Sequence, residues 1–153
     1  VPLIVGFARA LELCLEERES EARRLGGLRD RLLERLEKEI DGLTLSGPRR
    51  ARLPGNLHVC IDGVDADQVL VALPDVALST GSACASARGE PSHVLRALGV
   101  PEAALRSGLR MGLGRGTREA ELDHVAERLV EVVRRVRAAS PRRGAAAKLL
   151  PPP

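Results

Sequence analysis

A helical pattern of apolar residues runs through residues 3–40 and is the longest regular feature of the 153-residue chain. Apolar side chains recur there three and four positions apart, which places them along one side of an α-helix. They form two stripes, the first of which includes Cys14, and Gly26-Gly27 marks the point at which we expect the helix to kink or break. A helix of this length in so small a chain is expected to connect or support a larger structure, with Cys14 in its apolar core.

The rest of the chain alternates short strand and helix patterns. Alternating apolar residues, or short apolar runs between turn residues, predict strands at residues 43–45, 57–61, 76–78 and 109–113. Capping residues, together with Pro91 at a first helical position, predict helices at residues 65–73, at 91–99 and from Thr117 onward. The fold class is therefore α+β, with helices packed on a small, mainly antiparallel sheet. We expect one domain over residues 1–139 and a disordered tail over residues 140–153.

Charge and composition limit the classes of function. The chain has 24 Lys and Arg against 21 Asp and Glu, but these charges are interleaved as they are on solvated helix faces. Its only aromatic residue is one Phe, so aliphatic side chains build the core and no aromatic platform exists for base stacking. No apolar run has the length needed to cross a bilayer. Direct binding of nucleic acid and insertion into a membrane are therefore disfavoured.

The cysteines and the first residues bear on the compartment. Cys14, Cys60 and Cys84 are widely spaced, with no Cys-x-x-Cys pair for zinc and no even set for a secreted disulfide framework. They predict a reducing, cytoplasmic compartment. The chain starts at Val1 with neither an initiator Met nor a basic leader, so we expect it to begin within a longer sequence.

Cys84 lies in the segment with the clearest chemical signal. Residues 79–89 are nearly all small, so the segment has little to anchor it in a core and is expected to move. A nucleophilic cysteine must be a thiolate, which exposure, nearby cations and helix N-termini favour. Arg88 and the helix expected from Pro91 are candidates for the last two. From these residues alone, Cys84 is either a nucleophile or a cysteine in a flexible linker.

Several segments together resemble a known enzyme family. The pattern Ser-x-Gly-Ser-Ala-Cys that begins at Ser79 closely resembles the active-site region of NifS/IscS-like cysteine desulfurases. Four segments carry the resemblance: residues 1–6, 79–99, 109–115 and 117–123. It extends over about residues 1–141. The resemblance implies the small C-terminal domain of a fold-type I pyridoxal-phosphate enzyme of the class V aminotransferase superfamily, joined to its long connecting helix, residues 3–40.

The resemblance implies roles for particular side chains. Cys84 corresponds to the cysteine that takes sulfur from L-cysteine as a persulfide and leaves L-alanine, and Arg110 to the arginine that binds the substrate α-carboxylate. The strand pattern agrees with the second role, because Arg110 points away from the apolar face and a guanidinium suits a carboxylate. His93, in the first turn of its helix, either contacts the loop or substrate or is a surface or capping histidine. His58 and His124 are expected to face solvent.

The resemblance also implies a cofactor, but no residue in this chain that holds it. Pyridoxal phosphate is expected in the full-length enzyme, bound through a Schiff-base lysine in a large domain outside this chain. Lys38 lies on a charged helix and Lys148 in the tail, and neither lies in a matching motif. We therefore expect the chain alone to be inactive, and we assign no metal site.

The resemblance implies partners as well. These are L-cysteine, sulfur-acceptor proteins such as an iron–sulfur scaffold or a tRNA-thiolation enzyme, and a second copy of the full-length enzyme in a homodimer. Two other functions remain open. One is a selenocysteine lyase-like enzyme, which performs nearly the same chemistry, and the other is a non-catalytic module that docks sulfur acceptors.

Overall fold

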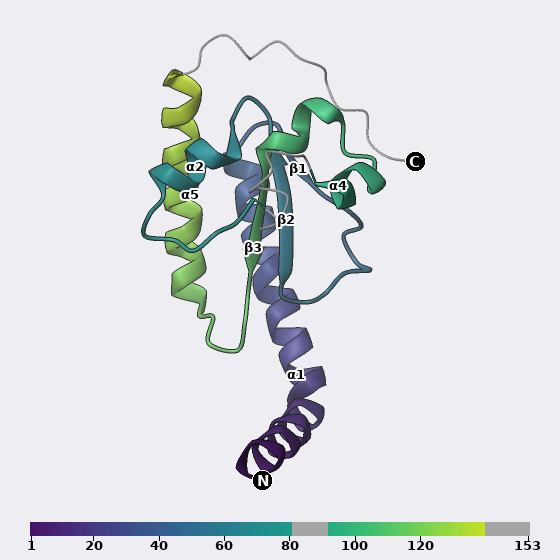
Figure 1. Cartoon of the computed structure of the whole chain (residues 1–153). Helices are drawn as coiled ribbons and strands as arrows, with labels where there is room; N and C mark the ends of the chain where they lie inside the picture. The colour runs from purple at the N-terminus through teal and green to yellow at the C-terminus, as the bar shows by residue number, and fades with distance from the viewer. Residues whose placement is uncertain (81–91, 140–153) are drawn as a thin grey trace.

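The computed structural model describes residues 1–80 and 92–139 and is shown in Figure 1. The helices are α1 (Pro2–Glu39), α2 (Ala66–Ala72), α4 (His93–Ala97) and α5 (Glu119–Ala139), with a 3₁₀ helix, η1 (Glu102–Ser107). The strands are β1 (Leu43–Leu45), β2 (Asn56–Ile61) and β3 (Gly108–Gly112). Helices therefore pack with a small antiparallel sheet, and the expected α+β class is confirmed.

The sheet separates an apolar face from a polar one. Its strands follow the order β1-β2-β3, and each neighbouring pair is antiparallel. Alternate residues of a strand point to opposite faces. Leu57 and Val59 of β2 and Leu109 of β3 share the apolar face and are fully buried in the main core with side chains of α1 and α5. The residues between them, including His58 and Arg110, belong to the opposite face.

The two long helices bury different lengths of their surfaces. α5 buries seven residues along its whole length, whereas the buried residues of α1 all lie between Arg29 and Leu36. The N-terminal half of α1 extends beyond the rest of the domain (Figure 1) and exposes apolar side chains, among them Phe7, which is 73% exposed. Among the described helices, none combines the length and the apolar character that a membrane span requires.

Three local expectations are wrong, each for a physical reason. α1 runs unbroken through Gly26-Gly27, because Leu25 beside this pair packs against the core and helps to offset the helix cost of about 1 kcal/mol per glycine. Residues 76–78 form no strand: only Ser79 reaches the sheet, by one bridge to β3. Cys14 is exposed, because the part of α1 that carries it lies beyond the domain core.

Candidate functional site

Arg110 lies in the middle of β3, on the sheet face opposite the main core, and its residue is exposed. Its backbone is held by Ser79: the Arg110 N–H donates to the Ser79 carbonyl at 2.7 Å, and the Ser79 N–H donates to the Arg110 carbonyl at 3.2 Å. Within residues 1–80 and 92–139, no ion pair or hydrogen bond engages the Arg110 guanidinium. A rigid backbone thus presents a cationic group that is available to an anionic ligand.

His58 is the cross-strand neighbour of Arg110, because β2 and β3 pair these two residues. The backbone groups of Arg110 point to Ser79, and the His58 carbonyl accepts from the Ser46 N–H at 2.9 Å on the other side of β2. The two residues therefore form a pair without mutual backbone hydrogen bonds. In such pairs the side chains approach more closely, with Cβ atoms about 5 Å apart.

Ser46 anchors the His58 ring from the end of β1. Its Oγ lies 2.9 Å from Nδ1 of His58 and 3.5 Å from Sγ of Cys60. The Ser46 carbonyl accepts a hydrogen bond from Nη2 of Arg52. Ser46 is itself buried, so its hydroxyl is a fixed partner rather than one that solvent replaces.

The environment of His58 and Cys60 keeps both side chains neutral at pH 7. Burial, together with the positive charges of Arg110 and Arg52, lowers the pKa of His58 from 6.5 to about 4, and burial is the largest of these causes. Burial raises the pKa of Cys60, so this cysteine is a thiol, and it is only 3% exposed. The expectation that His58 faces solvent is therefore wrong. His58 and Cys60 are two residues apart on one strand and so share a face, which could have indicated that both are covered. The sequence does not show which segments cover that face.

The other predicted site residues are placed only in part. Cys84 lies outside the described residues, so its role stays a prediction. His93 is the first residue of α4 and is exposed, and Leu95 of the same helix lies against Gly108 at the start of β3. His124 is exposed and contacts Asp75 at 3.1 Å, as expected of a surface histidine. The structure thus brings α4 next to the strand of Arg110, but it assigns no contact to His93.

The described residues do not form a pyridoxal-phosphate site. A Schiff base to this cofactor requires a lysine, and the one described lysine, Lys38, is exposed near the end of α1. Residues 1–80 and 92–139 also contain no cluster of His, Cys, Asp and Glu that could hold a metal ion. Any cofactor that acts at Arg110 must therefore be held by other residues.

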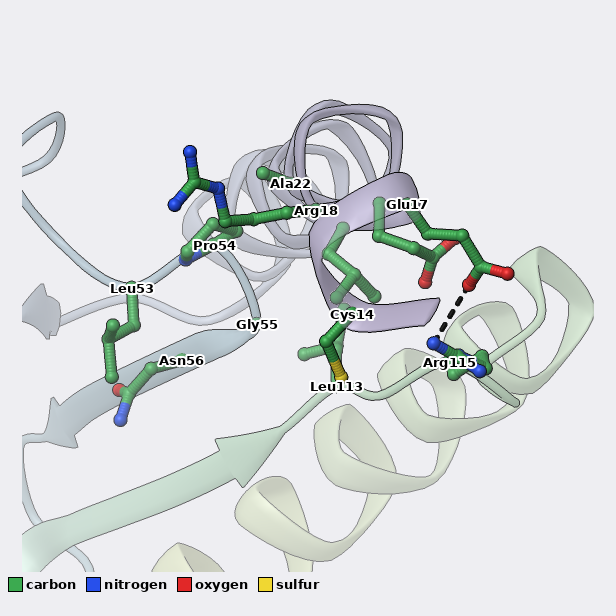
Figure 2. A pocket seen from close by; sticks show the side chains of 12 residues that line it. Cys14, Glu17, Arg18, Ala22, Leu53, Pro54, Gly55, Asn56, Leu113 and Arg115 are labelled. Atoms are coloured by element: carbon green, nitrogen blue, oxygen red, sulfur yellow. Dashed lines mark ion pairs between the residues drawn. The ribbon is translucent and has the colours of Figure 1, made fainter. Parts of the chain in front are cut away.

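A separate groove of about 570 Å³ lies beside the middle of α1, from Cys14 to Leu25 (Figure 2). The loop before β2 and the segment after β3 form its other walls, and Cys14 points toward Leu113 there. An ion pair between Arg115 and Glu17, 2.8 Å apart, crosses one end. Arg110, His58 and His93 do not line it. The groove is therefore distinct from the polar sheet face.

Comparisons with known proteins relate this arrangement to one family. The chain is 48% identical over 141 residues to "Cysteine desulfurase IscS" of Anaeromyxobacter sp. (strain Fw109-5), covering 92% of this chain and 35% of that protein. It is 41% identical over 140 residues to the mouse "Cysteine desulfurase", covering 92% and 30%. It is 41% identical over 138 residues to "Cysteine desulfurase, mitochondrial" of Arabidopsis thaliana, covering 90% and 30%. No family model matches.

Solved structures agree on the fold. A "NifS-like protein" matches with a TM-score of 0.72 and 26% identity, over 86% of this chain and 33% of that one. A NifS-like protein from Rickettsia africae matches with a TM-score of 0.73 and 23% identity, over 86% and 34%.

The fold is thus that of one part of NifS-like proteins, as the sequence resemblance predicts. The chain corresponds to a portion of a NifS/IscS-like cysteine desulfurase. It spans about a third of the length of the curated relatives it matches.

Proposed function

We propose that the protein to which this chain belongs is a cysteine desulfurase that converts L-cysteine to L-alanine and captures the sulfur as a persulfide on Cys84. The observation that carries the proposal is the exposed residue Arg110, whose guanidinium forms no hydrogen bond or ion pair with a described side chain. Its strand, β3, is hydrogen-bonded to Ser79. The segment that contains Cys84 follows directly from Ser79. The relatives that match over most of this chain are named cysteine desulfurases.

Arg110 supplies the anchor for the substrate. A guanidinium offers paired N–H donors in a plane, and these match the two oxygens of an α-carboxylate. Such a charge-assisted pair fixes the orientation of the substrate as well as its position. The strand backbone contributes because its bonds to Ser79 hold the Arg110 Cα in place.

Cys84 supplies the sulfur acceptor. It lies five positions after Ser79, which corresponds to a reach of about 18 Å along an extended chain. In the transfer, the bond between Cβ and sulfur of L-cysteine breaks and a sulfur–sulfur bond to Cys84 forms. The persulfide then passes its outer sulfur to an acceptor protein, which we propose to be an iron–sulfur scaffold or a tRNA-thiolation enzyme of the cytoplasm.

The rest of the protein must supply the cofactor and cover the exposed helix. Pyridoxal phosphate provides the electron sink that this reaction class needs, and no described residue of this chain fits it. The N-terminal half of α1 exposes apolar side chains, including Ile4, Phe7 and Leu15. We propose that the cofactor-binding domain packs on these side chains, that residues 1–139 form the small domain, and that the full-length enzyme is a homodimer.

The test compares the full-length protein with its Cys84→Ser and Cys14→Ser variants. Each is given L-cysteine and pyridoxal phosphate, alanine is quantified, and persulfide is located by alkylation and mass spectrometry. The expected result is persulfide on Cys84 in the wild type and in Cys14→Ser, and loss of sulfur transfer in Cys84→Ser. Unchanged sulfur transfer in Cys84→Ser would refute the proposal. Wild-type protein that makes no alanine but binds sulfur acceptors would favour the docking-module alternative.

The selenocysteine lyase alternative is separated by competition. The wild-type protein receives L-cysteine and L-selenocysteine together, and the release of sulfide and selenide is followed. A desulfurase releases sulfide at a rate comparable with that of selenide. A protein that releases selenide and is merely inhibited by L-cysteine would be the lyase.

A further inference from the structure

The side chain of His58 lies beside Arg110, yet neither binding of the carboxylate nor sulfur transfer uses it. The pairing of β2 with β3 places the two residues directly opposite each other on the polar face. The hydrogen bonds of Arg110 to Ser79 and of His58 to Ser46 run in opposite directions across the sheet. The pair is therefore of the kind in which facing side chains come closest.

The His58 ring is held on more than one side. Ser46 Oγ fixes Nδ1 at 2.9 Å. The ring also occupies the space that a side chain on Gly108 would fill, because a Cβ built there lies 2.9 Å from Cε1 and 3.2 Å from Nε2. The same position is 3.3 Å from Cδ1 of Leu95, so α4 closes this side. A ring restrained in this way is a rigid wall rather than a mobile surface side chain.

The ring is also neutral, which matters beside a cation. Its environment includes Arg110 and Arg52, whose charges disfavour a protonated imidazole. On its own strand, Cys60 is a buried thiol that adds no negative charge. A neutral ring opposite Arg110 does not repel its guanidinium.

We infer that His58 is a positioning residue that confines the Arg110 side chain and so presents its guanidinium to the substrate carboxylate. A free arginine loses much rotamer entropy when it binds a ligand. A rigid ring beside the arginine limits its rotamers before the ligand binds, so less entropy is lost on binding. The ring therefore strengthens binding although it does not contact the substrate. The identity of the ligand as an amino-acid carboxylate rests on the proposed function. The placement of His58 directly opposite Arg110 does not rest on it.

The contact is tested on the 153-residue chain by NMR titration of the His58 ring. We expect Arg110→Gln to raise the pKa of His58 from its wild-type value of about 4, because a nearby positive charge is removed. Arg134→Gln is the matched control, since Arg134 is an exposed arginine of α5. It should leave the His58 pKa unchanged. Equal pKa values of His58 in the wild type and in Arg110→Gln would overturn the contact.

The consequence for binding is tested in the full-length protein with three variants. His58→Ala should raise KM for L-cysteine about three- to tenfold, the range expected from ordering one long side chain, with little change in kcat. His58→Asn keeps a neutral polar group within reach of Ser46 and should restore most of the affinity. His124→Asn is the control. His124 is exposed on α5 and contacts Asp75, so this variant should change neither KM nor kcat.

The outcomes separate this inference from the proposed function. A fall in kcat at constant KM, or an effect of His58→Ala that His58→Asn does not relieve, would overturn the positioning role. Thermal melting of each variant identifies any that is unfolded, and His58→Asn then carries the comparison with the wild type. A wild-type protein that makes no alanine would defeat the proposed function, while the NMR response of His58 to Arg110→Gln would still report the contact.

Discussion

Replacement of Gly108 by Ala should destabilise the domain by displacing the His58 ring. The added Cβ would lie 2.9 Å from Cε1 of His58, closer than side-chain carbons normally approach, so the ring must move. Movement weakens the 2.9 Å contact with Ser46, which is worth about 1 kcal/mol, and overpacking costs a further 1 to 3 kcal/mol or so. The lower chain entropy of alanine in the unfolded state returns about 0.4 to 1 kcal/mol. The net loss should be about 2 kcal/mol.

Gly112→Ala is the matched control on the same strand and the same face. No atom lies within 4 Å of its added Cβ, so only the favourable entropy change of about 0.4 to 1 kcal/mol applies. Urea unfolding of the chain should be followed by far-ultraviolet circular dichroism, since the sequence contains no Trp or Tyr for fluorescence. Equal free energies of unfolding for the two variants would refute the view that His58 is packed rigidly against Gly108.

Three further predictions use the same unfolding assay. The pKa of His58 is about 4 in the folded state and 6.5 in the unfolded state. The contribution of the neutral ring to the free energy of unfolding is therefore fully present above pH 6.5 and is lost as the pH falls from 6.5 to about 4. About 2 kcal/mol should therefore be lost between pH 7 and 4.5, and less in His58→Asn. Leu129→Ala should cost about 2 to 5 kcal/mol, because this fully buried side chain of α5 fills the core; a loss below 1 kcal/mol would contradict that packing. Arg24→Ala should lower the free energy of unfolding, because its guanidinium donates to three carbonyl oxygens between β3 and α5, whereas Arg134→Ala should be nearly neutral; equal values for the two variants would contradict this role of Arg24.

The elements that local signals specify could be predicted from the sequence. The spacing of apolar residues predicts α1 and α5, and alternation predicts β2 and β3 to within a residue or two. The helix predicted at residues 65–73 is found as α2, and its first residue in that range, Asp65, caps it, since its carboxylate accepts from the Asp67 N–H. These features depend on neighbours close in sequence, so the pattern itself contains the information.

Features that depend on distant segments could not be predicted in the same way. Residues 76–78 are apolar because Val76 and Leu78 pack against the core, and burial alone does not supply a strand partner. Cys14 belongs to a helical stripe, but its stripe extends past the elements that could cover it. The environment of His58 depends on the pairing of β2 with β3 and on Ser46, which follows β1 and contacts the ring. The spacing of apolar residues in the sequence reveals neither.

The connection between Ser79 and Arg110 suggests how one site can both hold a substrate and release its sulfur. In the proposed function, substrate binding requires a guanidinium in a constant position, whereas transfer to an acceptor requires Cys84 to reach a second location. Two backbone hydrogen bonds fix Ser79 to the Arg110 strand at the point where the cysteine segment begins. The segment after Ser79 is predicted to be mobile because its residues are small. Any such movement would begin after Ser79, which is held to β3, so it need not displace Arg110. The inferred role of His58 serves the same separation, because the ring would restrain Arg110 from the side of β2, and its own packing against Ser46 and Gly108 does not involve the cysteine segment.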